Sequence, residues 1–256
     1  ARIAAGEVIT HPADVVRELV ENALDAHAGN IHVEITTGGL ASICVHDDGD
    51  GIPLDDAHLL FTRHATSKGD QHNQLAGISS LGFRGEGLAS IATVAQVVLR
   101  SRHTSDDHGF SLATGPQTPP AITWIARQHG TSVEVHDLFS GYPVRRRALV
   151  PATIQREVRH TLLQLAIARP DVAMRLDADE RMLATTPGST RDGLLAAVCE
   201  APALDRLVQL PTMRGNGWSL DGIVAPPGTH LRGLHRVAMS VNGRRTNVEP
   251  LLSALQ

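Results

Sequence analysis

Apolar and polar residues follow a helical period near the start of the chain. Residues 12–26 have the spacing of an amphipathic helix that opens at His11-Pro12-Ala13-Asp14. Its apolar side carries Val16, Leu19, Val20 and Ala23. Glu18, Asn22 and Asp25 lie on another side, spaced i, i+4 and i+7. An amide between two carboxylates is typical of a solvated helix face, but it also suits a site for a metal-bound ligand.

Alternation with a period of two predicts strands further along. A hairpin turn at Gly38-Gly39 joins the strands expected at 31–36 and 42–47. Strands are also predicted at 96–102, at 131–136 and on both sides of Asp179, and helices at 54–61, 87–95 and 154–168. Residues 62–86 read as a long functional or mobile loop, and TGPQTPPA at 114–121 as a surface loop. This irregular order favours an α+β fold, an α/β sandwich with a mixed sheet.

Pro187-Gly188-Ser189-Thr190 is the best candidate for a linker. We therefore expect a first domain at 1–187 and a smaller α/β domain at 188–256. The second domain would contain a helix from Gly193 and strands at 220–225 and 237–241, and would be incomplete at its C-terminal end. The chain opens on ARIAAGEV and stops on LLSALQ, so we expect a fragment of a longer protein.

Composition limits the possible partners. Hydrophobic residues make up 42% of the 256 residues and charged ones 20%, which predicts a packed core. The net charge of -4 argues against a nucleic-acid binder that acts by bulk charge. Cys44 and Cys199 are far apart, which fits a reducing cytoplasm better than a disulfide framework. We find no signal peptide and no apolar run of the roughly 18 residues that a membrane helix needs, so no membrane partner is expected.

Three further short segments are candidates for chemistry. DDGDGI at 47–52 ends a strand on Asp47, whose carboxylate can accept a hydrogen bond from an exocyclic amine such as that of adenine. An ordinary turn is the alternative there. SSLGFRGEGLASI at 79–91 puts glycines and Arg84 before a helix, where backbone N–H groups can hold phosphate, although a plain glycine loop is the alternative. Gly130-Thr131 precedes a strand, and this threonine hydroxyl can support Asp47.

Taken in order, these segments resemble an ATPase superfamily. It includes type II topoisomerase B subunits, a heat-shock chaperone family, histidine kinases and the mismatch repair family MutL. IAAGEVI at 3–9, TRHATSK at 62–68 and SLGFRGEGLASI at 80–91 are similar to MutL within it, as is DLFSGYPVRRRALV at 137–150. The similarity covers nearly the whole chain, and the first half carries most of its specificity.

The resemblance implies ATP and Mg²⁺ as ligands and a role for each matching residue. Glu18 would be the general base and Asn22 the Mg²⁺ ligand. Asp47 would bind the adenine amine, with Gly51 beneath the base and Thr131 beside it. A nucleotide lid at about 62–86 would bring Thr66, Ser67 and Lys68 near the phosphates. The loop that holds the β and γ phosphates would contain Gly82, Phe83, Arg84 and Gly85.

Several positions depart from the family pattern. Asp48 stands where the family usually has Asn, Gly87 where it has Ala, and His27 where it has Gly. Asp48 would add negative charge near the phosphates and weaken nucleotide binding, and Gly87 would loosen the helix start by up to about 1 kcal/mol. SGYPVR at 140–145 replaces YNTPAR. The family also supplies a catalytic lysine beyond the VNGR strand, whereas the only lysine here is Lys68.

The resemblance implies Mg²⁺-dependent ATP binding and slow hydrolysis, used as a conformational and dimerisation switch in DNA mismatch repair. Expected partners are a second copy of the chain, a mismatch-recognition protein and DNA, in the cytoplasm and at the nucleoid. Two alternatives stay open. One is a nucleotide-binding scaffold or dimerisation module without significant turnover. The other is a different ATPase of the superfamily, such as a topoisomerase B subunit or a kinase.

Two groups of side chains have weaker signals. A basic cluster suits sequence-independent contact with DNA phosphates. The alternative, that these arginines form only a solvated charged surface, has equal weight. The cluster comprises Arg145, Arg146, Arg147, Arg156 and Arg159. Six histidines have irregular spacings and no HExxH pattern, so we expect mostly surface residues and give a zinc site little weight. They are His27, His32, His46, His58, His64 and His72.

Overall fold

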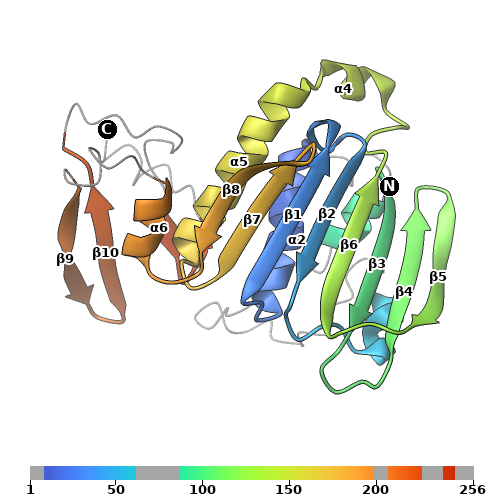
Figure 1. The fold of residues 1–256 in the computed structure, drawn as a ribbon, viewed down its shortest axis with the longest axis horizontal. Helices are drawn as coiled ribbons and strands as arrows, with labels where there is room; N and C mark the ends of the chain where they lie inside the picture. The colour runs from blue at the N-terminus through green and yellow to red at the C-terminus, as the bar shows by residue number, and fades with distance from the viewer. Residues whose placement is uncertain (1–8, 62–86, 199–206, 227–238, 246–256) are drawn as a thin grey trace.

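The computed structural model describes residues 9–61, 87–198, 207–226 and 239–245. Its centre is an eight-stranded sheet in the order β5-β4-β3-β6-β2-β1-β7-β8 (Figure 1). All neighbouring strands are antiparallel except β1 and β7, which run parallel. The sheet is therefore mixed, as predicted. The strands are β1 (Asn30–Thr36), β2 (Ser42–Asp47), β3 (Gln96–Arg102), β4 (Gly109–Gly115), β5 (Thr118–Ile125), β6 (Gly130–His136), β7 (Ala173–Ala178) and β8 (Arg181–Pro187).

Helices cover one face of this sheet. The longest, α5, packs against α2 and β7, and α2 also contacts α3 and β2. Figure 1 shows α2 and α5 behind the strands, with the opposite sheet face open. The helical elements are α2 (Pro12–Asp25), α3 (Gly87–Ala92), α4 (Pro143–Ala148), α5 (Pro151–Ala168) and α6 (Arg191–Val198), with the 3-10 turns η1 (Thr37–Gly39) and η2 (Leu54–Leu59).

Alternation along each central strand explains the layers. In β1, Ile31, Val33 and Ile35 are buried towards the helices, while the intervening His32 and Glu34 are more exposed. Strands β2, β3, β6 and β7 show the same alternation. The apolar core thus lies between the sheet and the helices, which confirms the expected α/β sandwich.

The predicted surface loop at 114–121 is wrong. Strand β4 continues to Gly115 and β5 starts at Thr118, so only Pro116 and Gln117 form the turn. Of the three prolines in this segment, Pro116 lies in the turn, while Pro119 and Pro120 lie in an edge strand. An edge position tolerates proline because the missing N–H is not needed for a second neighbour.

Beyond β8 the described elements are smaller. They are α6, the hairpin of β9 (Val208–Gly215) and β10 (Trp218–Val224), and the short pair β11 (Ser240–Val241) and β12 (Arg244–Arg245). Helix α6 and β10 match the helix and first strand expected after residue 188, whereas part of the strand expected at 237–241 lies outside the described residues. The domain boundary at 187/188 stays a prediction. Within the described ranges, no helix has the length and apolar character needed to span a membrane.

Candidate functional site

Helix α2 starts on a reciprocal cap. The Nδ1 of His11 accepts the N–H of Ala13 at 3.2 Å, and the Oδ2 of Asp14 accepts the N–H of His11 at 2.9 Å. Such a capping box satisfies N–H groups that the first helical turn leaves without partners. The cap and the buried apolar side fix the helix, so Glu18 and Asn22 are held half-buried on its remaining side.

Glu18 lies against the start of α3. A Cβ added to Gly87 would stand 2.7 Å from the Oε2 of Glu18, closer than a real Cβ contact allows. The other carboxylate oxygen, Oε1, accepts a hydrogen bond from Arg17 at 3.3 Å. Gly87 was expected only to loosen the helix start; its missing side chain also makes room for this carboxylate.

Asp47 ends β2 beside Thr131 of β6. Its Oδ1 accepts the N–H of Gly49 at 3.0 Å and the N–H of Thr131 at 3.2 Å. Both hydrogen bonds that the described residues make to this carboxylate use Oδ1, which leaves Oδ2 for a ligand. Burial raises the pKa of Asp47, and the two backbone hydrogen bonds only partly offset that rise. Asp47 and Thr131 thus lie side by side, but the contact uses the backbone N–H of Thr131 and not the hydroxyl that the sequence suggested.

Ser101 completes this group, and sequence reasoning missed it. The Ser101 hydroxyl is fully buried in β3, 3.0 Å from the Thr131 hydroxyl, and it accepts the N–H of Ile52 at 2.8 Å. Asp47, Thr131 and Ser101 therefore stand side by side on three neighbouring strands. The available signal was a serine at a position of 96–102 where the alternation calls for an apolar residue.

The segment after Asp47 is fastened to the end of α2. The N–H of Asp50 donates to the carbonyl of Ala26 at 2.7 Å, and a Cβ at Gly49 would lie 2.4 Å from the same oxygen. Gly51 has φ +77°, and a Cβ there would lie 2.0 Å from the carbonyl oxygen of Arg102. Only glycine fits such close approaches. These contacts hold the end of β2 beside the helix that carries Glu18 and Asn22.

His27 follows α2 at a position where the related family usually has Gly. Its φ of 58° lies in the left-handed region that glycine occupies without strain. The His27 ring is 2.6 Å from a carboxylate oxygen of Asp50, so the substituted side chain makes a contact that glycine cannot.

Asp48 has a structural partner that the sequence did not indicate. Its Oδ1 accepts the N–H groups of Gly29 and Asn30, each at 2.8 Å, and its Oδ2 accepts the side-chain amide of Asn30 at 2.7 Å. Partial burial would raise the pKa of Asp48, but these hydrogen bonds lower it overall. The carboxylate thus fastens the turn between α2 and β1.

Several predicted site residues lie outside the described residues. The whole expected lid at about 62–86 belongs to this group, so the roles of its residues stay predictions. The site residues concerned are Thr66, Ser67, Lys68, Gly82, Phe83, Arg84 and Gly85.

The basic cluster is partly used inside the fold. The Arg145 guanidinium lies 5.2 Å from the Phe139 ring centroid, and Arg146 donates to the carbonyl of Leu40 at 3.2 Å. Arg159 likewise donates to a backbone carbonyl, that of Leu183 at 3.2 Å. Arg147 and Arg156 are exposed. DNA contact by the cluster stays a prediction.

Comparison with known proteins gives consistent matches. The family described as "Histidine kinase-, DNA gyrase B-, and HSP90-like ATPase" matches residues 9–114. The DNA mismatch repair protein MutL of Thiobacillus denitrificans is 39% identical over all of this chain and 43% of its own length. MutL of Geobacillus kaustophilus is 37% identical over all of this chain and 40% of its own length. The chain thus spans less than half the length of these relatives.

Solved structures agree with the sequence matches. The Aquifex aeolicus MutL ATPase domain complexed with ADP has a TM-score of 0.70 at 25% identity, over 97% of this chain and 88% of that one. A second structure, the N-terminal domain of a DNA repair protein, reaches a TM-score of 0.78 at 23% identity, over 98% of this chain and 79% of that one. The second likeness concerns the fold alone.

Proposed function

The chain belongs to the MutL family of DNA mismatch repair proteins, as part of their N-terminal ATPase region, and we propose that it binds ATP with Mg²⁺ and hydrolyses it slowly. Membership in this family is reason to set aside the alternative of a topoisomerase B subunit or a kinase. The scaffold alternative, which binds nucleotide without turnover, is separated from our proposal by the assay below.

The observation that carries this proposal is the set of contacts made by the Asp47 carboxylate. Its Oδ1 accepts two backbone N–H groups, so Oδ2 would be the oxygen that accepts one amine hydrogen of adenine. Thr131 stands beside the carboxylate, and Gly51, which the family resemblance puts beneath the base, lies in the turn after β2. A related MutL ATPase domain has been solved with ADP, which is consistent with this assignment.

The helix next to this strand end would carry the reacting groups. Asn22 offers an amide oxygen, a ligand type suited to Mg²⁺, which binds oxygen atoms and keeps several waters. Glu18, one turn earlier, has a half-buried carboxylate that can accept a proton from the attacking water. Bound Mg²⁺ would neutralise phosphate charge, while Lys68 and the residues at 82–85 would complete the phosphate contacts.

ATP would act as a switch in this proposal. Contacts from the γ phosphate would order the lid and favour association of two copies of the chain, and hydrolysis would reverse this. The partners would be a mismatch-recognition protein and DNA, met in the cytoplasm at the nucleoid. Exposed Arg147 and Arg156 are the cluster members best placed to reach DNA phosphates without reading sequence.

A steady-state ATPase assay tests the catalytic half. We expect Mg²⁺-dependent phosphate release by the chain, and a loss of at least about 100-fold in Glu18→Ala because a general base contributes 10²–10⁴. Nucleotide affinity should change little. Glu180→Gln, which changes an exposed glutamate in the turn between β7 and β8, is the control and should retain full turnover. Unchanged turnover in Glu18→Ala would refute its role, and binding by the chain without turnover would favour the scaffold.

A further inference from the structure

The open face of the sheet carries ionisable side chains in register. His32 and Glu34 alternate with buried residues in β1, so both side chains point away from the helices. In the parallel neighbour β7, Asp177 is the register partner of Glu34. On the other side, His46 of β2 pairs with His32. Three strands thus bring together residues that are distant in sequence.

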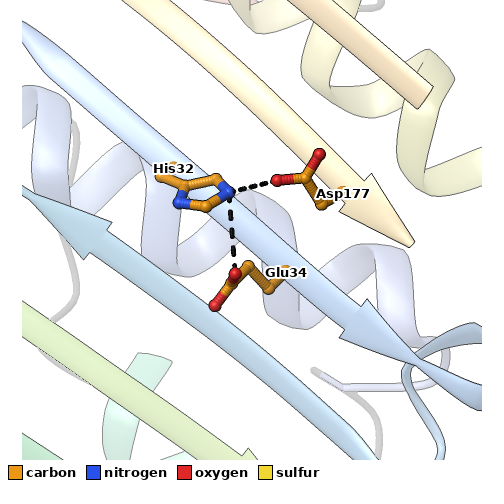
Figure 2. A group of neighbouring side chains, drawn as sticks. All are labelled: His32, Glu34 and Asp177. Carbon is orange, nitrogen blue, oxygen red and sulfur yellow. Dashed lines mark hydrogen bonds and ion pairs between the residues drawn. The ribbon is translucent and has the colours of Figure 1, made fainter. Parts of the chain in front are cut away.

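Three of these side chains converge on a single point. The Nε2 of His32 lies 2.6 Å from an oxygen of Asp177 and 3.8 Å from an oxygen of Glu34. Figure 2 shows both carboxylates directed at the same ring nitrogen. The three potential ligand atoms all lie within 4.8 Å of one another. That spacing allows one ion to bind all three after small side-chain shifts.

The surroundings favour an ion over a closed hydrogen-bond network. The Nε2 of His46 lies 3.5 Å from the second oxygen of Glu34, which places another imidazole at the edge of the group. Oδ1 of Asp177 is buried and has no hydrogen-bond partner among the described residues. Next to the group is an open cavity of about 370 Å³ whose lining includes His32 and His46. Water and an ion can therefore reach it.

Arg175 is the internal competitor for such an ion. Its Nε donates to the Asp177 oxygen that also contacts His32, at 2.7 Å. The Arg175 side chain is 56% exposed, so it can move into solvent at little energetic cost. In the absence of a metal, this guanidinium supplies the positive charge that two neighbouring carboxylates need.

We propose that His32, Glu34 and Asp177 bind one divalent transition-metal ion of the Zn²⁺ type. Imidazole nitrogen together with carboxylate oxygen suits Zn²⁺ or Co²⁺, whereas Mg²⁺ prefers oxygen ligands alone. Water would fill the remaining positions. The ion would join β1 to β7 through His32 and Asp177, which are 145 residues apart in the chain. The site is on the open sheet face, whereas Glu18 is on α2 at the other face, and its ligands include none of the proposed ATP-binding residues.

Titration of ZnCl₂ into the nucleotide-free chain, prepared without a histidine tag and in excess Mg²⁺, tests this site. Calorimetry should show one saturable equivalent, and Co²⁺ should give a visible d–d spectrum. His32→Gln and Asp177→Asn should each weaken Zn²⁺ binding at least tenfold. The same loss is expected for Glu34→Gln, whose side chain is exposed. His136→Gln, a histidine of β6 on the same sheet face, is the control and should bind like the parent.

Arg175→Ala separates a metal site from an ion-pair network. Removing the competing guanidinium should strengthen Zn²⁺ binding, and Zn²⁺ should raise the melting temperature of the parent but not of His32→Gln. Circular dichroism establishes that each variant is folded. No saturable binding by the parent, or equal affinity in His32→Gln, Glu34→Gln and the parent, would overturn the proposal and leave an ion-pair network only.

Discussion

Asp47 gains its proposed role from neighbours that lie far away in the sequence. The segment DDGDGI is equally typical of a plain turn, and the pairing with Thr131 was only a weak signal until the family resemblance supported it. Ser101, which fixes the Thr131 hydroxyl, escaped prediction because nothing in the local sequence says which strand lies beside β6. Helical spacing alone predicted that Glu18 and Asn22 share one helix face, whereas their roles come from the family resemblance and stay predictions.

Asp47→Asn should stabilise the nucleotide-free fold at neutral pH. Burial raises the pKa of Asp47 in the folded state above its value in the unfolded state. The carboxyl therefore favours folding at pH values below the unfolded pKa, and it opposes folding once pH rises through the folded pKa. Asparagine keeps the acceptor oxygen without the buried charge. Thermal melts should give a higher melting temperature than the parent at pH 7, with the difference shrinking towards pH 4.

Asp107→Asn, at an exposed position, is the control and should melt like the parent at both pH values. A lower melting temperature of Asp47→Asn at pH 7 would contradict the assignment of its raised pKa to the cost of a buried charge.

Among the elements, the long helices and most sheet strands were predictable, whereas the inner strand β4 was not predicted although its burial alternates. Strand β3 was predicted at its observed bounds, and α2 and α5 within a few residues, because their apolar faces are buried and strictly periodic. Strand β5 was missed because edge strands lack this pattern and tolerate proline. The short helix α4 was missed as well, since it buries no residue and so has no apolar face to detect.

The turn between β2 and η2 should depend on Gly51. Gly51→Ala introduces a Cβ 2.0 Å from the Arg102 carbonyl oxygen at φ +77°, so the backbone must shift. We expect a loss of about 2 kcal/mol in the free energy of unfolding, measured by urea denaturation. Gly141→Ala is the matched control, because a Cβ there meets nothing within 4 Å. Equal losses in the two variants would refute the close approach.

The turn between α2 and β1 should be pH-sensitive through Asp48. Its folded pKa is lowered, so its contribution to stability is present above the unfolded pKa and is lost as pH falls through the folded pKa. Asp48→Asn places a donor opposite the Asn30 amide. We expect a loss of about 1 kcal/mol at pH 7 that disappears as pH falls through the folded pKa of Asp48, measured by denaturant titration.

Nucleotide affinity should change less than threefold in Asp48→Asn, because the carboxylate is already bound to Gly29 and Asn30. A large gain in affinity would instead support the earlier expectation that Asp48 repels the phosphates.

In the molecule as a whole, the sheet separates two kinds of surface. The helix side holds the core with the buried Ser101 and Thr131, while the open side holds the His32 group. Sequence periodicity predicted that each strand has two faces, but not the strand order that brings β7 beside β1. The proposed zinc site illustrates this, because its candidate ligands come from two strands that are neighbours only in the fold, whereas histidine spacing along the sequence gave a zinc site little weight.

Association of two chains should follow nucleotide occupancy. We expect light scattering to give the mass of a monomer for the chain alone or with ADP, and a larger mass with Mg²⁺ and a non-hydrolysable ATP analogue. An identical mass in all three states would contradict the dimerisation switch for this chain, while leaving ATP binding itself to be judged separately.

The most direct test of the central claim, a Mg²⁺–ATP pocket around Asp47, is calorimetric titration of a non-hydrolysable ATP analogue. It is run with and without Mg²⁺, into the chain and into Asp47→Asn. Our account predicts saturable, Mg²⁺-dependent binding by the chain and at least tenfold weaker binding by the variant, because one hydrogen bond to a charged group is lost. Equal binding by both proteins, or no binding by a folded chain, would contradict it.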